Sequence, residues 1–84
     1  MDPDTLESRL LSLLTSVAPD IEPQNLDPAR ALREQVDFDS MDTLHFAAAV
    51  SKTFGIDIAE TEYARLASLR AAEAFVRERL AAKG

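Results

Sequence analysis

The sequence predicts an all-α fold, a small bundle of three main helices plus one short helix, in a single domain over residues 1–84. Apolar residues recur at helical spacing in three separate stretches, and no stretch shows the sustained alternation expected of a strand. Proline, glycine or serine marks the ends of these stretches, where such residues cap or stop helices. With 46% apolar residues, the chain can build one small core of its own.

The first helix is expected over residues 3–17. Asp2 can cap its start, and Pro3 suits the first helical position, where a missing N–H costs nothing. Pro19 ends the helix, because the residue before a proline is pushed out of the α region. The apolar stripe of this helix consists of Leu6, Leu10, Leu13, Leu14 and Val17.

A long connection follows over residues 18–39, and its apolar residues share no single helical period. A short helical turn is expected after Asp27-Pro28. A loop of this length is unusual in a small domain and is more often functional or held against the core than mobile. The residues expected to anchor it are Leu26, Leu32 and Val36.

The second helix is expected from Ser40 or Met41 to Phe54, with Gly55 as a left-handed cap. Its inward face should carry Leu44, Ala47, Val50 and Phe54, with Phe46 beside them.

A short helical segment is expected over Glu60–Leu66, and a last helix from Ser68 to about Ala82, with Ser68 as its N-cap. The residues expected to face inward on this last helix are Leu69, Ala72, Phe75, Val76 and Leu80.

Composition and charge exclude several classes of function. Fifteen acidic and nine basic residues give a net charge of −6, which disfavours nucleic acid and anionic membranes as partners. From charge alone, the simplest interpretation is that the acidity aids solubility. The lack of cysteine excludes disulfides and cysteine ligation of zinc, and the single histidine, His45, cannot form a multi-histidine metal site alone. We expect a cytoplasmic, monomeric protein without stable membrane association.

The stretch "VDFDSMDTLHF" places Ser40 between two aspartates at the start of the second helix. Ser40 could be a helix N-cap that contributes about 1 kcal/mol. It could instead be a nucleophile, but His45 lies about 140° around the helix from it and no Gly-x-Ser-x-Gly elbow is present. A third interpretation is an attachment point, where a phosphate ester would meet free N–H groups and the positive end of the helix dipole.

Asp39-Ser40-Met41-Asp42 resembles the Asp-Ser-Leu signature of acyl carrier proteins, in which the serine carries 4′-phosphopantetheine. The similarity covers essentially all 84 residues. The signature lies between an amphipathic helix with its proline-containing loop and the later segments "KTFGIDI", "ETE" and "ASLRAAEAFVRERL", in the order and spacing of that family.

The resemblance implies a non-catalytic carrier. A phosphopantetheinyl transferase would use Mg²⁺ and coenzyme A to attach the arm to Ser40, with Asp39 beside the transferase's metal site. The arm's thiol would hold an acyl group as a thioester for the ligases, synthases and transferases of lipid or secondary-metabolite synthesis. Partner enzymes would contact Met41, which replaces the usual leucine. The other residues that the resemblance places at partner surfaces are Asp42, His45, Glu60 and Glu62.

Departures from the family pattern indicate a specialised carrier with its own partners. Val36-Asp37 stands where Leu-Gly is common, which should reshape the turn into the helix. The exposed face of that helix carries Asp42, His45, Ser51 and Lys52 instead of the usual glutamates. Three alternatives stay open: an acyl carrier, an aminoacyl or peptidyl carrier with the same arm, and an unmodified helical interaction module. The run Ala47-Ala48-Ala49 favours close helix packing over room for a bound chain.

Overall fold

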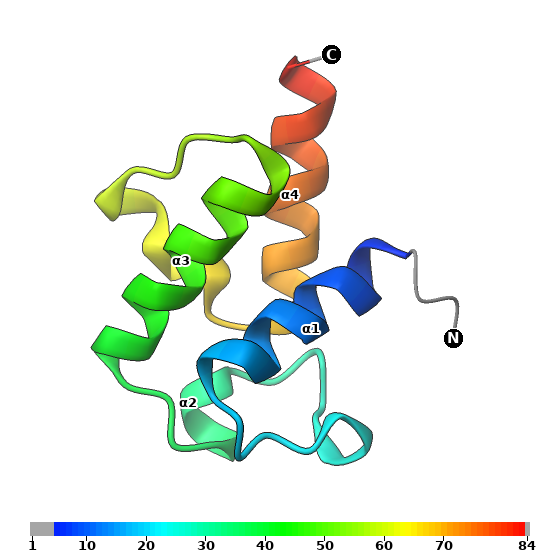
Figure 1. Ribbon diagram of the computed structural model, residues 1–84, viewed down its shortest axis with the longest axis vertical. Coiled ribbons are helices and arrows are strands. Elements are labelled where there is room, and N and C mark those ends of the chain that lie inside the picture. Colours follow the sequence, from blue (N-terminus) through cyan, green and yellow to red (C-terminus); the bar gives the residue numbers. More distant parts are fainter. Residues whose placement is uncertain (1–4, 84) are drawn as a thin grey trace.

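The computed structural model describes residues 5–83, and within this range it contains helices, turns and loops but no strand (Figure 1). The three long helices are α1 (Leu6–Val17), α3 (Ser40–Phe54) and α4 (Leu69–Lys83). The shorter elements are η1 (Pro23–Asn25), α2 (Leu32–Gln35) and η2 (Glu60–Leu66). The predicted bundle of three main helices plus one short helix is therefore confirmed, and the connection before α3 contains η1 and α2 as well.

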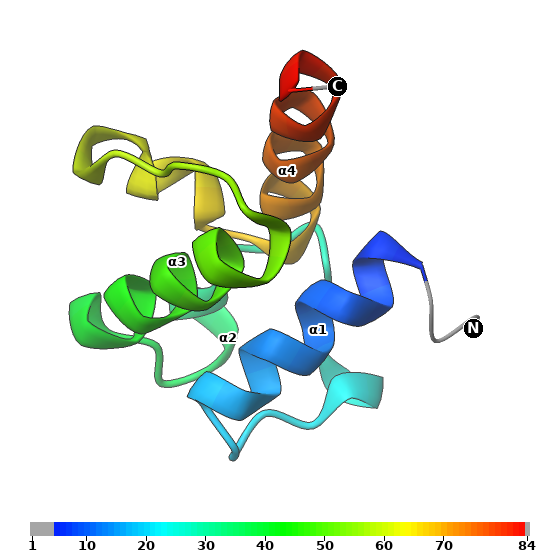
Figure 2. The ribbon, with the colours of Figure 1, turned by 45° about the horizontal axis from the view of Figure 1, so that its top comes forward.

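The α1 helix packs against both α3 and α4, and η2 packs against the other side of α3 and against α4 (Figure 2). Side chains from all these elements meet in one apolar core. Its fully buried large members are Leu10, Leu14, Leu32, Phe46, Val50, Leu66, Leu69, Phe75 and Val76. None of the described helices has both the length and the apolar character that crossing a membrane requires.

Most helix ends follow the sequence analysis. Gly55 ends α3 in the left-handed region, with φ of 65° and ψ of 39°, a conformation that glycine adopts without a Cβ clash. The Ser68 hydroxyl accepts a hydrogen bond from the Ala71 N–H at 3.1 Å and caps α4 as predicted. The start of α1 lies later than expected, because Thr5 is extended and its hydroxyl accepts from the Ser8 N–H. The predicted cap Asp2 and first helical residue Pro3 lie outside the described residues.

Two predicted core residues are wrong. Leu44 is 42% exposed, because α3 turns Phe46, Ala47 and Val50 inward, and Leu44 lies about 200° around the helix from Phe46. Leu80 is 37% exposed, because it lies near the end of α4 that extends past the other helices (Figure 1).

The long connection is anchored to the core as predicted. Leu32 is buried, and Leu26 and Val36 are partly buried against the core. Ile21 and Phe38 are also buried, which the sequence analysis did not predict.

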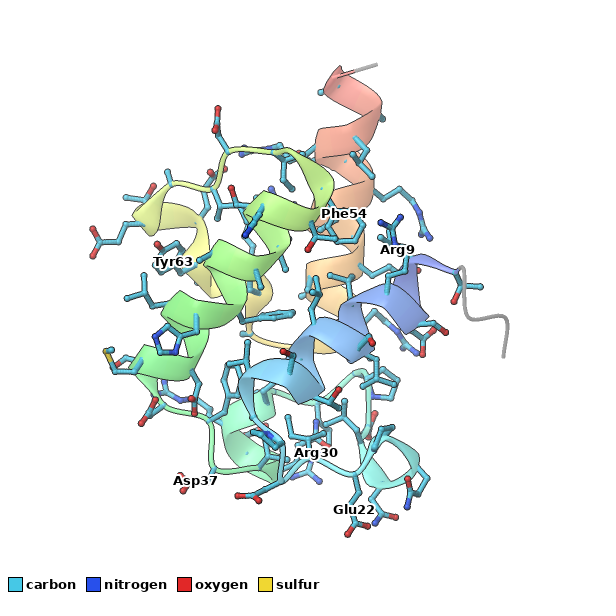
Figure 3. All side chains as sticks on the ribbon, in the orientation of Figure 1. Arg9, Glu22, Arg30, Asp37, Phe54 and Tyr63 are labelled. Carbon is cyan, nitrogen blue, oxygen red and sulfur yellow. The ribbon has the colours of Figure 1, made fainter. Side chains whose placement is uncertain are left out.

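At the other end of the core, Arg9 of α1 stacks on Phe54 of α3, with its guanidinium carbon 4.8 Å from the ring centroid (Figure 3). This cation–π contact fastens the start of α1 to the end of α3.

Charged side chains hold η2 against α4. Arg79 pairs with Glu62 and donates a hydrogen bond to the Asp57 carbonyl at 3.1 Å, and Arg65 pairs with Glu78 at 2.7 Å. The guanidinium carbons of Arg65 and Arg79 each lie 4.8 Å from the centroid of the buried Phe75 ring. Phe75 thereby links both arginines to the core.

The Arg65–Glu78 pair generates a prediction about pH. The hydrogen bond from Arg65 lowers the pKa of Glu78 below its ordinary value, and the attraction of the two charges adds to this shift. The carboxylate is therefore the favoured form in the folded protein. The pair stabilises the fold above the unfolded-state pKa, and this contribution is lost as the pH falls through the lower folded-state pKa. Arg65→Gln should raise the pKa of Glu78 in a carboxyl NMR titration.

Arg77→Gln is the matched control, since it removes the ion-pair partner of Glu73 and leaves the Arg65–Glu78 pair intact. An unchanged Glu78 titration in Arg65→Gln would show that the pair does not persist in solution.

Candidate attachment site at the start of α3

Two aspartates begin α3 by capping each other. Asp39 Oδ1 accepts a hydrogen bond from the Asp42 N–H at 2.9 Å, and Asp42 Oδ2 accepts one from the Asp39 N–H at 3.2 Å. The backbone of Asp39 is extended, with φ of −97° and ψ of −174°, and α3 begins at Ser40. Asp39 is therefore the N-cap, and the interpretation of Ser40 as the cap is wrong. Asp39 caps the helix in preference to Ser40, because the Asp42 side chain bonds back to the Asp39 N–H and completes a reciprocal capping box.

The reciprocal cap leaves the Ser40 side chain at the surface. Ser40 is exposed, and among the described residues its hydroxyl has no hydrogen-bond partner. His45 is also exposed, as predicted, and lies more than one turn further along α3. The hydroxyl is thus free to react, with no histidine base positioned beside it.

An open cavity of about 350 Å³ lies beside Ser40, between α2, α3 and η2. Its polar lining consists of Arg33, Ser40, Thr43 and Tyr63, and its apolar wall consists of Leu32, Phe38, Ala64 and Ala67. Figure 3 shows Tyr63 on η2 beside α3. Neither this cavity nor the places of Arg33 and Tyr63 could be predicted from the sequence, because only the folded loop brings α2 beside α3 and η2.

Backbone hydrogen bonds between distant segments put α2 in position. The Leu32 N–H donates to the Ala67 carbonyl at 2.7 Å, and the Arg70 N–H donates to the Pro28 carbonyl at 2.9 Å. The Gln35 side chain bonds both the N–H and the carbonyl of Asp27, each at 2.8 Å. The two backbone bonds hold the connection against the turn between η2 and α4. The α2 side of the cavity is therefore fixed relative to its η2 side.

Asp37 occupies the turn into α3 where glycine is common in acyl carrier proteins. Among the described residues only Gly55 has a positive φ, so the turn at Asp37 needs no left-handed backbone. Phe38 then turns inward and meets the Phe46 ring edge-on, with centroids 6.4 Å apart and planes at 82°. The packing of Phe38 against Phe46 holds the chain in place just before α3 begins.

The residues predicted to contact partners fall into two groups. Met41 is 56% exposed, and His45 and Glu60 are exposed as well, so these three are accessible at the surface. Asp42 and Glu62 already have partners inside the protein: Asp42 caps α3, and Glu62 pairs with Arg79 and accepts a hydrogen bond from the Ala59 N–H. The partner roles of all five stay predictions.

The capping geometry generates a prediction about stability. Asp39→Ala should lower the free energy of unfolding by about 1 kcal/mol, because the Asp42 N–H loses its acceptor. Ser40→Ala should change it by less than about 0.5 kcal/mol, because the serine is exposed and caps nothing. Chemical denaturation followed by circular dichroism measures both. A larger loss from Ser40→Ala than from Asp39→Ala would contradict the assignment of the cap.

Comparison with protein families identifies this region. A family described as phosphopantetheine attachment site matches residues 8–76. This range includes Ser40, α2 and all the residues that line the cavity. No curated protein matches the chain. Members of the matching family carry 4′-phosphopantetheine covalently on a serine. The chain belongs to the phosphopantetheine attachment site family and is a carrier domain of the acyl carrier protein type.

Proposed function

We propose that Ser40 is the serine to which 4′-phosphopantetheine is attached. The observation that carries this proposal is the exposed, unpartnered Ser40 hydroxyl at the first position of α3. Ser51 and Ser68 are partly buried and their hydroxyls are hydrogen-bonded to the backbone, and Ser8, Ser12 and Ser16 lie within α1. A helix N-terminus also favours a phosphate ester, because first-turn N–H groups and the helix dipole attract negative charge.

Loading would be a phosphoryl transfer from coenzyme A. Ser40 Oγ forms a bond to the phosphorus that carries the pantetheine arm, the bond from that phosphorus to the adenosine bisphosphate breaks, and the serine proton passes to a base of the transferase. Mg²⁺ on the transferase would neutralise the phosphates. On this chain, Asp39 Oδ1 stays occupied by the Asp42 N–H, while Oδ2 accepts no hydrogen bond within residues 5–83 and can face the metal.

The loaded domain would then act as a non-catalytic carrier. Carrier domains of this family interact with phosphopantetheinyl transferases and with synthetic enzymes. We propose an acyl group as the cargo, held as a thioester and presented to ligases, synthases or transferases of lipid or secondary-metabolite synthesis. An aminoacyl or peptidyl cargo on the same arm is the alternative. A monomeric state and a cytoplasmic location stay predictions.

Intact-protein mass spectrometry tests the attachment. After incubation with coenzyme A, Mg²⁺ and a broad-specificity phosphopantetheinyl transferase, the protein should gain the mass of one phosphopantetheinyl group. Ser40→Ala should gain nothing, while Ser16→Ala, which removes an exposed serine of α1, should be loaded like the unchanged protein. A folded protein that no transferase loads, or a loaded Ser40→Ala variant, would overturn the proposal.

Asp39→Asn separates the two roles of this residue. Asparagine caps a helix about as well as aspartate, so the free energy of unfolding should change by less than about 0.5 kcal/mol. The loss of the charge should slow loading by about tenfold or more, because the transferase's metal loses a carboxylate neighbour. The initial rate of the mass gain measures this effect. Equal loading rates would restrict Asp39 to capping.

A further inference from the structure

The surroundings of Ser40 are acidic, which creates a problem for a phosphate at this position. Asp37, Asp39 and Asp42 lie within three positions of the serine, in a chain with a net charge of −6. A phosphodiester on Ser40 would add another negative charge beside them. Negative charges on neighbouring residues repel one another, and a nearby cation reduces this repulsion.

Arg33 is the basic residue that lines the same cavity as Ser40. Its side chain is exposed, and among the described residues it has no ion-pair or hydrogen-bond partner. Other arginines of the chain are already engaged with carboxylates, carbonyls or aromatic rings, namely Arg9, Arg30, Arg65, Arg77 and Arg79. Arg33 is thus a cation without a partner among the described residues, and it lines the cavity into which a phosphodiester on Ser40 could extend.

The position of Arg33 is set by its neighbour rather than by its own contacts. Leu32 is buried in the core, and its N–H donates a hydrogen bond to the carbonyl of Ala67, which also lines the cavity. This anchor fixes the short α2 helix, so that Arg33 lies at the cavity edge without a bond of its own. Because this guanidinium has no ion pair among the described residues, it can bind a phosphate without first breaking one.

Tyr63 supplies a polar group on the η2 side of the cavity (Figure 3). Its ring is partly buried against the core, and its hydroxyl has no partner among residues 5–83. Apart from Ser40 and Thr43, the rest of the cavity lining is apolar. The phosphopantetheine arm carries groups that match this lining in kind: a phosphate, a carbon that bears two methyl groups, and amides.

We propose that Arg33 is the counter-ion of the phosphodiester on Ser40, and that the Tyr63 hydroxyl bonds an amide of the arm, so that the first part of the arm lies in the cavity between α2 and η2. This inference rests on the proposed attachment at Ser40. A cavity of about 350 Å³ is near the lower limit for small-molecule sites. It suits the start of the arm rather than the arm together with a long apolar chain. Arg33 and Tyr63 act as positioning residues, since neither reaches the thioester.

The test compares apo and holo forms of three arginine variants, after mass spectrometry has shown that each holo protein carries the arm. Arg33→Gln removes the cation, Arg33→Lys keeps a charge without the guanidinium fork, and Arg70→Gln is the control. Arg70 is exposed outside the cavity, and only its backbone N–H is bonded, to Pro28.

The ³¹P resonance of the phosphodiester is the first readout. Arg33→Gln should shift it, Arg33→Lys should shift it less, and Arg70→Gln should leave it unchanged. Denaturation is the second readout. Arg33→Gln should lower the folding equilibrium constant of the holo form by about threefold to fivefold more than that of the apo form. About 1 M salt should remove most of this difference, because the pair is exposed.

Tyr63→Phe tests the second contact, since it removes the hydroxyl and keeps the ring. It should shift the amide-proton resonances of the arm and leave the ³¹P resonance in place. Unchanged amide resonances would overturn the role of Tyr63.

A ³¹P resonance and an apo-to-holo difference that are the same in Arg33→Gln and Arg70→Gln would overturn the role of Arg33. Both failures require an attached arm. The absence of any mass gain would instead refute the attachment at Ser40, so the two proposals fail in distinguishable ways.

Discussion

The reciprocal hydrogen bonds between Asp39 and Asp42 are the constraint on which the site depends. They end the extended segment at Asp39 and start α3 at the next residue, which places Ser40 at the first helical position. If the serine itself capped the helix, its hydroxyl would be occupied by a backbone N–H and less able to react. The aspartates take over the capping, and the serine is left with an open hydroxyl at the positive end of the helix dipole. The aspartates thus cap the helix, and the Ser40 hydroxyl is left without a structural role among the described residues.

The second requirement of the site is that the connection before α3 is held against the core. Residues 18–39 form a long segment with little helix, yet Ile21, Leu32 and Phe38 are buried, and backbone bonds tie Pro28 and Leu32 to the start of α4 and the end of η2. These hydrogen bonds join segments that are about 35 to 42 residues apart in the sequence. They give a short helix such as α2, which would not be stable alone, a fixed place beside Ser40.

Periodicity was sufficient to predict the three long helices, because each buries a continuous apolar stripe, and glycine and serine chemistry was sufficient for the cap residues Gly55 and Ser68. Leu44 was misassigned because the core lies on the side of α3 that carries Phe46, and Leu80 because a stripe read from one helix does not show where its neighbours end. The serine was found from a local pattern. Arg33 and Tyr63 were not, because their proximity to it arises from tertiary hydrogen bonds and from η2 packing, which leave no signal in the spacing of residues.

The distribution of free and occupied carboxylates bears on how partners would recognise this carrier. Next to Ser40, the exposed face of α3 presents Met41, Leu44 and His45, while the carboxylate of Asp42 is held by the backbone. On η2, Glu62 is paired with Arg79, and the carboxylate of Glu60 is exposed. A partner that docks here would meet the apolar surface of Met41 and Leu44, together with the exposed carboxylates of Asp37 and Asp39 that flank Ser40. The apolar part of such a contact depends on shape and area, and salt should weaken only the part that the carboxylates contribute. The adaptable thioether of Met41 suits such a surface, because it can fit the pocket of a dedicated partner enzyme without a matching charge.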